Sequence, residues 1–366
     1  TGNGGTFVRG YGKIIGPRVV EVDGVRYTAT KALVIAAGTK AAIPPIPGLD
    51  TVPFWTNREA LKSREVPESL VVLGGGAIGC ELAQVFNRFG SKVTIIEAAP
   101  RLIALERRGA GEILARALAG GGISVIVGVG AKRVAKDAAT GDVSVTLADG
   151  SVVSGAVLLV ATGRTSDLKS ISAEVLGVDP KTHRALPTNN FLEVVDDSDS
   201  IVSGVYAIGD VAGKGAFTHV AVTQGRMVAD QILGKPTAPW DTRQVGHVTF
   251  TDPEVGAVGL TEDAARNAGI TVATASYPME STTRGWIHGA GNKGTFKLVV
   301  DADKGVIVGG TIVGPHAGEI LAGLTVAVVG KVPVQQLIET VWAYPTYHRG
   351  FDAVLAELPD NLKSGR

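Results

Sequence analysis

The clearest pattern of apolar and polar positions lies between residues 70 and 97. Residues 70–73 are apolar without interruption, as expected of a strand buried on both faces. A glycine-rich turn follows at residues 74–79, and apolar residues then recur with the helical period until about Phe89, after which Gly90 ends the helix. Residues 93–97 form the next apolar strand. This succession predicts a βαβ unit with parallel strands.

A second pattern occurs twice. Two short runs of alternating residues flank Asp23-Gly24, a dipeptide that favours a two-residue hairpin, and an apolar strand follows at residues 33–38. The same order recurs around Asp149-Gly150 and at residues 157–163. Two domains of the same type are therefore expected. Only 37 residues precede Gly38, too few for a complete βαβ start, so we expect the opening half of the first domain to be absent from this chain.

Beyond residue 163 the pattern changes. A helix is expected from about Phe217 to Leu233, with Gly234 and Pro236 as stop signals and residues 236–240 as a linker. From residue 246 onward, strands of antiparallel type are expected at residues 294–300 and 306–313, followed by apolar helices near residues 317–330 and 334–340. These elements predict a separate α+β domain.

Composition narrows the class of protein. At 366 residues the chain can form two or three domains, and 45% hydrophobic residues with 49 glycines suit tightly turned α/β nucleotide-binding units. Lys plus Arg and Asp plus Glu both number 35, so nothing in the charge favours nucleic acid or an anionic membrane as a partner.

Signals for targeting and metal binding are weak. The N-terminal residues resemble no signal peptide, and no apolar stretch reaches the ~20 residues that span a bilayer. Cys80 is the single cysteine, which excludes an internal disulfide and a multi-cysteine metal site, and the six histidines lack ligand spacing. We expect a cytoplasmic protein without a metal centre, in which Cys80 is a small packed side chain.

The turn at residues 74–79 has the spacing of a dinucleotide-binding fingerprint. Gly74 allows a tight turn, Gly76 lets the backbone approach a pyrophosphate, and Gly79 lets the helix pack closely on the strand. The helix N-terminus, which includes Ile78, offers unpaired N–H groups and a positive dipole end to phosphates. Because the turn follows a strand and begins a helix, we interpret it as a binding site rather than as a ligand-free glycine loop.

Glu97 indicates which dinucleotide is bound. It lies about twenty residues beyond the turn, where a carboxylate can accept a hydrogen bond from the ribose 2′-hydroxyl. This acid favours NAD(H), since it would repel a 2′-phosphate. Arg101 is close enough in sequence to reach a 2′-phosphate, so NADP(H) stays open as an alternative, but we expect Arg101 on the surface.

Several motifs occur in the order found in one family. They lie at residues 35–39, 74–81, 161–164, 207–210, 250–255, 258–259, 294–300 and 313–319. Over almost its whole length the chain resembles the class I pyridine nucleotide–disulfide oxidoreductases, the flavoprotein family of dihydrolipoamide dehydrogenase and mercuric reductase. The resemblance implies an α/β fold with a Rossmann-type NAD(P)-binding domain, a partial FAD-binding domain and a C-terminal α+β dimerisation domain. The implied segments are residues 1–66 (first part of the FAD domain), 67–165 (NAD(P) domain), 166–238 (second part of the FAD domain) and 239–366 (dimerisation domain).

The resemblance implies FAD as a second cofactor and points to the residues that would bind it. Asp210, which follows Gly209, resembles the carboxylate that holds the flavin ribityl chain. Gly38 and Gly163 belong to the matching motifs that follow two apolar strands. Without the resemblance, Asp210 is an acid after a strand-terminal glycine, and such an acid can serve merely as a cap on the next segment.

The resemblance also implies how the flavin would be tuned. Phe217, Thr218 and His219 resemble the start of a helix whose N-terminus faces the flavin pyrimidine edge, where its dipole would stabilise reduced flavin. Glu81 resembles the helix acid near the contact between flavin and nicotinamide. The implied reaction passes a hydride from nicotinamide to flavin and then electrons to a second acceptor.

The C-terminal motif departs from the family pattern. Tyr344 stands where the family has a histidine base, and Arg349 stands where it has a glutamate. A base needs a pKa near the working pH, and a tyrosine hydroxyl titrates at about 10. His348 lies four residues away and is not a simple substitute. The family's redox-active cysteine pair would precede residue 1.

Three hypotheses follow. The first is an NAD(P)H-dependent flavoprotein that reduces a quinone, a metal ion or another small oxidant. The second is a dithiol–disulfide enzyme of the dihydrolipoamide dehydrogenase type with a rearranged base. For an enzyme of either type, Glu81, Tyr344 and His348 are the candidate catalytic residues. The third is a non-catalytic, nucleotide-binding scaffold. In each case the C-terminal domain is expected to form a homodimer, with Trp342 and Tyr344 near the partner's active site.

Overall fold

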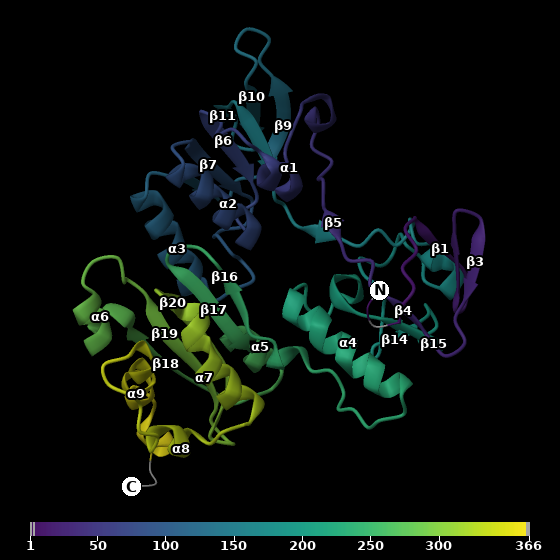
Figure 1. The fold of residues 1–366 in the computed structure, drawn as a ribbon. Helices are drawn as coiled ribbons and strands as arrows, with labels where there is room; N and C mark the ends of the chain where they lie inside the picture. The colour runs from purple at the N-terminus through teal and green to yellow at the C-terminus, as the bar shows by residue number, and fades with distance from the viewer. Residues whose placement is uncertain (1, 3, 364–366) are drawn as a thin grey trace. The chain divides into compact units, whose positions relative to one another are not determined.

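A computed structural model describes residues 2 and 4–363 of the chain (Figure 1). The chain forms two compact units, each assembled from two stretches of sequence: residues up to 40 with 164–242, and residues 41–163 with those from 243 onward. Residues 41–66, expected with the first segment, cluster in the second unit, where Trp55 forms an isolated bridge to Leu159. Among the described residues, no helix is long and apolar enough to cross a membrane.

A four-stranded parallel sheet forms the dinucleotide-binding domain of the second unit. Its strands lie in the order β12 (Val157–Val160), β6 (Ser69–Leu73), β7 (Lys92–Glu97) and β8 (Ser124–Val127). Helix α2 (Ala77–Arg88) connects β6 to β7, and α3 (Arg108–Gly120) connects β7 to β8. Leu70 and Leu73 are at most 2% exposed, as the uninterrupted apolar run predicts. The structure thus confirms the expected βαβ unit.

Smaller elements surround this sheet. An antiparallel sheet consists of β9 (Ala131–Lys136), β10 (Val143–Leu147) and β11 (Val152–Gly155). Helices η1 (Leu49–Thr51) and α1 (Asn57–Lys62) precede β6. The expected turn at Asp149-Gly150 is a three-residue loop, because Leu147 and Ser151 still pair through their backbones. Asp149 stabilises this loop by accepting hydrogen bonds from the backbone and hydroxyl of Ser151.

The C-terminal domain is built on a five-stranded antiparallel sheet. The strand order is β16 (His247–Thr249), β17 (Glu254–Gly259), β20 (Val306–Gly314), β19 (Thr295–Asp301) and β18 (Val272–Pro278). The helices are α5 (Glu262–Asn267), η5 (Met279–Ser281), α6 (Thr283–His288), α7 (Ala317–Val329), α8 (Val334–Ile338), η6 (Tyr347–Arg349), α9 (Gly350–Ala356) and η7 (Asp360–Leu362). The predicted strands and both apolar helices are confirmed.

The two faces of this sheet belong to different cores. Helices α7 and α9 pack on one face, where Ile312 of β20 joins their side chains. Val313, the next residue of β20, points to the opposite face and joins Val255 and Leu114 of α3 in the core of the dinucleotide-binding domain. The dinucleotide-binding and C-terminal domains therefore share a core and form one unit.

The first unit contains two three-stranded sheets. One is β1 (Gly12–Gly16), β2 (Val19–Val22) and β3 (Val25–Thr28); the other has the order β14 (Glu193–Val195), β15 (Ile201–Ala207) and β4 (Leu33–Ile35), with β15 parallel to β4. Asp23 and Gly24 both have positive φ angles, 49° and 80°, as a two-residue turn of type I′ requires. The predicted hairpin is confirmed.

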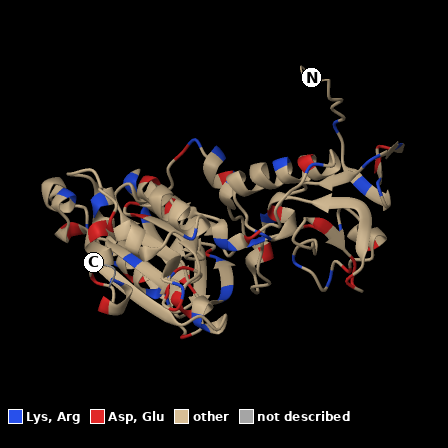
Figure 2. Ribbon diagram, turned by 90° about the horizontal axis from the view of Figure 1, so that it is seen from below, with Lys and Arg blue, Asp and Glu red and all other residues tan. Residues whose placement is uncertain are grey.

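The remaining elements are short, apart from one long helix. Helix α4 (Thr218–Ile232) matches the expected helix within one residue at each end, and η2 (Ala173–Leu176) and η3 (Gly209–Ala212) accompany it in the first unit. Strands β5 (Lys40–Ala41) and β13 (Arg164–Thr165) and helix η4 (Thr242–Gln244) lie where the chain passes between units. In the ribbon of Figure 2, segments coloured for acidic and for basic residues alternate along both units, in keeping with the balanced charge.

Candidate functional site

Three glycines shape the turn between β6 and α2, and each meets a different constraint. Gly74 has a φ of 105°, which a glycine adopts without strain. A Cβ atom on Gly79 would lie 1.9 Å from the carbonyl oxygen of Gly74, so only glycine fits there. A Cβ atom on Gly76, the N-cap of α2, would meet nothing within 4 Å. The turn is therefore closed by Gly74 and Gly79 and open at Gly76, where a pyrophosphate has room to approach.

Glu97, at the end of β7, is bonded directly to this turn. Its Oε2 accepts a hydrogen bond from the backbone N–H of Gly75 at 2.6 Å, and its Oε1 accepts one from Ala99 N–H at 2.7 Å. The side chain is half-buried, and each oxygen keeps a second lone pair that can accept from a ribose hydroxyl. Ile78, in the first turn of α2, packs partly buried against the core of the domain.

Arg101 corrects one expectation from the sequence. It is half-buried rather than exposed: its Nη2 atom donates hydrogen bonds to the backbone carbonyls of Ala104 and Glu106, at 2.7 and 3.1 Å, and its Nε atom is buried. The guanidinium group is therefore committed to its own loop rather than extended toward the ribose of a nucleotide.

Cys80 is the small packed residue that the sequence predicts. It is fully buried, and its Sγ donates to the carbonyl oxygen of Gly75 at 3.3 Å. Burial, reinforced by the charges of Glu97 and Glu81, raises the pKa of its thiol to about 12. A thiol with this pKa is almost entirely protonated at neutral pH and is a poor nucleophile.

Glu81 connects helix α2 to the C-terminal domain through a hydrogen bond. Its Oε1 accepts a hydrogen bond from the backbone N–H of Phe250 at 2.7 Å. One turn later, Gln84 accepts from Asp252 N–H and donates to the Asp252 carbonyl, and Arg88 forms an ion pair with the carboxylate of Asp252. Three turns of α2 therefore hold the loop at residues 250–252. The catalytic role assigned to Glu81 stays a prediction.

In the first unit, three of the sequence motifs meet at Asp210. Thr39 Oγ1 donates a hydrogen bond to Asp210 Oδ2 at 2.8 Å. Arg164 donates from Nε to Thr39 Oγ1 at 2.6 Å, and its Nε lies 3.7 Å from Asp210 Oδ2. Asp210 is a partly exposed carboxylate in a polar cluster, which suits a group that accepts hydrogen bonds from hydroxyls.

The other residues of the predicted flavin site lie at turns or at a helix start. Gly38 and Gly209 have positive φ angles of 68° and 70°, and Gly163 has one of 131°. The backbone N–H of Gly209 donates to Oε1 of Gln224, a fully buried side chain on α4.

Helix α4 begins as predicted. Phe217 is its N-cap, Thr218 is its first residue, and the ring of His219 is exposed and stacked on Phe217 with centroids 5.4 Å apart. This N-terminus has no side-chain cap, and the helix dipole places partial positive charge there.

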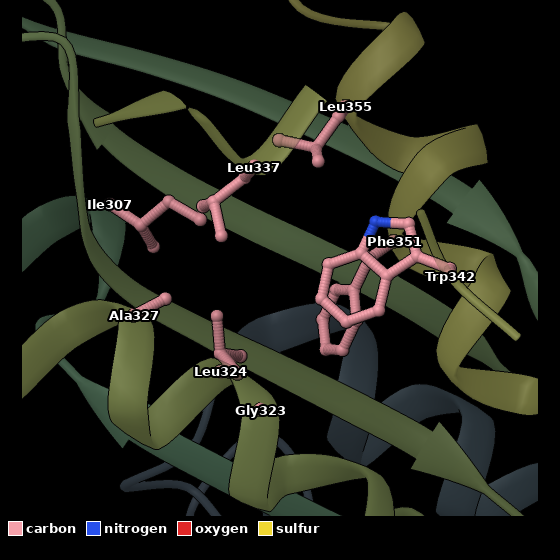
Figure 3. A pocket seen from close by; sticks show the side chains of 8 residues that line it. All are labelled: Ile307, Gly323, Leu324, Ala327, Leu337, Trp342, Phe351 and Leu355. Carbon is pink, nitrogen blue, oxygen red and sulfur yellow. The ribbon is translucent and has the colours of Figure 1, made fainter. Parts of the chain in front are cut away.

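The C-terminal segment does not place a histidine at the family's base position. Tyr344 is 65% exposed, and the guanidinium of Arg349 lies over its ring, 5.6 Å from the centroid. His348 is half-buried in η6. Trp342 packs on Phe351 within its own domain, beside a small cavity of about 10 Å³ (Figure 3). Trp342 is thus partly buried in its own domain, and its place near a partner's active site, together with that of Tyr344, stays a prediction.

Sequence reasoning missed several residues that shape the site. Thr39 and Arg164 stood in the motifs, but their bonds to Asp210 and to each other carried no local signal. Gln224, Arg107 and His247 were also missed, because their partners lie far away in sequence.

These features define an α/β dinucleotide-binding protein, and comparison with known proteins gives its family. The family model described as pyridine nucleotide-disulphide oxidoreductase matches residues 1–225, and that of its dimerisation domain matches residues 245–354. The chain belongs to the pyridine nucleotide-disulphide oxidoreductase family. Members of this family are oxidoreductases that use FAD and NAD(P)H. The resemblance and the fold class inferred from the sequence are thereby confirmed.

Relatives of two kinds are similar to the chain. A dihydrolipoyl dehydrogenase of Thermus scotoductus is 35% identical over 357 residues, which cover 95% of this chain and 74% of that protein. A mercuric reductase of Staphylococcus aureus is 31% identical over 344 residues, which cover 94% of this chain and 61% of that protein. The chain spans 53% of the length of the Bacillus cereus mercuric reductase.

Among solved structures, the chain is similar to RclA of Escherichia coli, an HOCl-induced flavoprotein disulfide reductase in a Cu(II) complex. The TM-score is 0.82 at 26% identity, with 95% of this chain and 78% of that chain covered.

Proposed function

We propose that the protein is an NAD(P)H-dependent flavoprotein oxidoreductase that passes reducing equivalents through FAD to a small-molecule acceptor. The observation that carries this proposal is the turn at Gly74–Gly79. It combines an open N-cap at Gly76 with a Glu97 carboxylate that is bonded to the same turn. Backbone amides there can bind a diphosphate while the acid accepts from the adjoining ribose.

NADH is the proposed electron donor. Glu97 presents negative charge where the adenine ribose would lie, and Arg101 is held away by two backbone carbonyls. A 2′-phosphate would therefore meet an acid without a compensating base. The family match supports a nicotinamide cofactor but does not separate NADH from NADPH.

FAD is proposed to bind beside Asp210. Bound flavin would accept the hydride and release electrons singly or in pairs. Asp210, pre-oriented by Thr39 and Arg164, offers an oxygen to ribityl hydroxyls. The N-terminus of α4 would stabilise negative charge on the ring.

The second acceptor is proposed to be a quinone, a metal ion or another small oxidant. Position 344 carries an exposed tyrosine where the family has a histidine base, which disfavours dithiol chemistry. A dithiol–disulfide activity with a rearranged base is the alternative, because dihydrolipoyl dehydrogenases are among the relatives. A nucleotide-binding scaffold is a third possibility. We propose a homodimer formed through the C-terminal domain, which matches the family's dimerisation domain.

The substitution Glu97→Gln tests the donor assignment. Because it removes a charged acceptor for the ribose, we expect the Kd of NADH, measured by fluorescence titration of the full chain, to rise about tenfold. NADPH binding should change little or improve. Glu112→Gln on the exposed face of α3 is the matched control and should leave both affinities unchanged.

A second experiment separates the acceptor classes. NADH oxidation by the FAD-loaded protein is followed with a quinone, Hg²⁺ and lipoamide in parallel. Turnover with the quinone or the metal ion supports the proposal, and turnover with lipoamide alone supports the dithiol alternative. A protein that binds NADH but retains no flavin absorbance would be a scaffold.

A further inference from the structure

Residues 101–107, which we call the strap, connect the dinucleotide turn to the C-terminal domain. Near one end, Ile103 donates its backbone N–H to the carbonyl of Gly75 at 2.7 Å. At the other end, Glu106 Oε1 lies 2.6 Å from Nε2 of His247 on β16. The buried Arg107 donates from Nη2 to the carbonyl of Leu260 at 3.1 Å.

The bond from Ile103 orients an amide that would face the nucleotide. The carbonyl of Gly75 and the N–H of Gly76 belong to one planar trans peptide, in which they point in opposite directions. Because the N–H of Ile103 holds the carbonyl of Gly75, the direction of the Gly76 N–H at the open N-cap of α2 is fixed as well. The preceding peptide is fixed by the bond between Gly75 N–H and Glu97.

The conformation of Ile103 must be imposed by its surroundings. Its φ angle is 41°, in the left-handed region that a β-branched residue rarely adopts, and its side chain is 4% exposed. The carbonyl of Ile103 accepts from Glu106 N–H at 2.8 Å, which links its conformation to the position of Glu106. Releasing Glu106 would allow Ile103 to relax and to withdraw its N–H from Gly75.

His247 is surrounded by acceptors. Besides Glu106, it forms a hydrogen bond to the backbone of Val245 that favours the charged ring. A neutral imidazole has a single N–H, so it cannot donate to both acceptors, whereas the imidazolium can. Deprotonation therefore costs one of the two bonds and also removes the positive charge that faces the Glu106 carboxylate.

Several charged groups on the elements around His247 already form hydrogen bonds or ion pairs with other residues. Helices α2 and α7 and strand β17 pack against β16. Their acids Glu81 and Glu254 accept from the backbone amides of Phe250 and Gly318, and Arg88 pairs with Asp252. Further charged groups on these elements and on the strap are Glu319, Arg101 and Arg107.

We propose that the Glu106–His247 pair is a pH-sensitive positioning device for the dinucleotide site, in which the imidazolium holds the strap and the strap aims the Gly76 amide at the pyrophosphate. The proposal rests on the proposed binding of NADH at this turn. It predicts that the affinity for NADH depends on the protonation of His247, which lies outside the nucleotide site.

The direction of the pH dependence follows from the surroundings of His247. Burial lowers its pKa, but the hydrogen bond and charge of Glu106 and the bond to Val245 outweigh this and hold the pKa above its ordinary value of 6.5. The charged pair is complete below that pKa and is lost as the pH rises through it. NADH should therefore bind more tightly at pH 6 than at pH 8.5.

The test is a fluorescence titration of the full chain with NADH between pH 6 and 8.5. The Kd of the wild type should rise roughly fivefold across this range, the scale of one charge-assisted hydrogen bond. In His247→Gln the Kd should vary little with pH. By linkage, calorimetry in buffers of different ionisation enthalpy should show proton uptake on NADH binding by the wild type and none by His247→Gln.

Two further variants complete the experiment. His183→Gln removes another histidine–acid pair, His183 with Asp197 at 2.9 Å, and should keep the wild-type pH profile. Glu106→Gln should flatten the pH dependence of the NADH Kd as His247→Gln does. It provides the test if His247→Gln does not fold. A wild-type profile retained in both His247→Gln and Glu106→Gln would overturn this inference, whereas absence of saturable NADH binding at every pH would instead overturn the proposed function.

Discussion

At the residue scale, the glycines of the turn meet different requirements. Some are needed because the chain packs closely around them, and Gly76 leaves room for the proposed ligand. Gly79 is enclosed by protein atoms, whereas Gly76 faces open space with an ordinary negative φ of −74°. One glycine is therefore required by the packing of the turn, and the other leaves space for the proposed nucleotide.

This difference predicts opposite outcomes for two alanine substitutions. Gly76→Ala should leave the thermal unfolding midpoint unchanged but raise the Kd of NADH at least about tenfold, because the methyl group occupies the approach of the pyrophosphate. Gly79→Ala should lower the midpoint, since its Cβ would clash with the Gly74 carbonyl. Gly109→Ala in α3, where a Cβ meets nothing, is the control and should affect neither quantity adversely. Unaltered NADH binding by Gly76→Ala would contradict the proposed site.

Cys80 gives a second prediction at this scale. With full burial and a thiol pKa of about 12, it should not react with a thiol reagent at pH 8 in the native protein. It should react with a stoichiometry of one after unfolding in denaturant, as measured by the absorbance of the released chromophore. Rapid labelling of the native chain would show that the α2 N-terminus opens readily.

At the element scale, helix α3 joins two domains. Leu114 is fully buried in the core that also contains Val255 and Val313 of the C-terminal sheet. Leu114→Ala should lower the free energy of unfolding by about 2–5 kcal/mol, the range for deleting a buried leucine side chain. Glu112→Ala on the exposed face of the same helix should change it by less than about 0.5 kcal/mol. Denaturant titration of both variants measures the difference.

Elements with strong local patterns were predictable from the sequence. The βαβ unit, the Asp23-Gly24 hairpin, helix α4 and the C-terminal strands follow from hydrophobic periodicity and turn residues, which act over short distances. The glycine turn and the position of Glu97 at the end of a strand were predictable for the same reason, whereas their binding of a nucleotide stays a prediction.

The remainder of the site depends on long-range contacts. Glu106 and His247 are 141 residues apart, and Glu81 and Phe250 are 169 residues apart, so neither pair produces a local pattern. Arg101 was expected on the surface because charged residues usually are, yet two carbonyls of its own loop satisfy it. The φ angle of Ile103 follows from the packing around the strap and not from its residue type.

At the scale of the whole molecule, the dinucleotide-binding and C-terminal domains behave as one unit. They share the core around α3, the α2 contacts to the loop at residues 250–252, and the strap. These contacts connect the C-terminal domain to the turn at Gly74–Gly79 within a single subunit. The chain is similar to both dihydrolipoyl dehydrogenases and mercuric reductases, so the identity of its electron acceptor has to be measured.

The central claim is that the Gly74–Gly79 turn binds the diphosphate of NADH. A crystal structure of the chain with NADH tests it most directly. The account predicts the pyrophosphate at the N-terminus of α2, within hydrogen-bonding distance of the Gly76 amide, and the adenine ribose on the Glu97 carboxylate. NADH bound elsewhere, or the turn left empty at a saturating concentration, would contradict it.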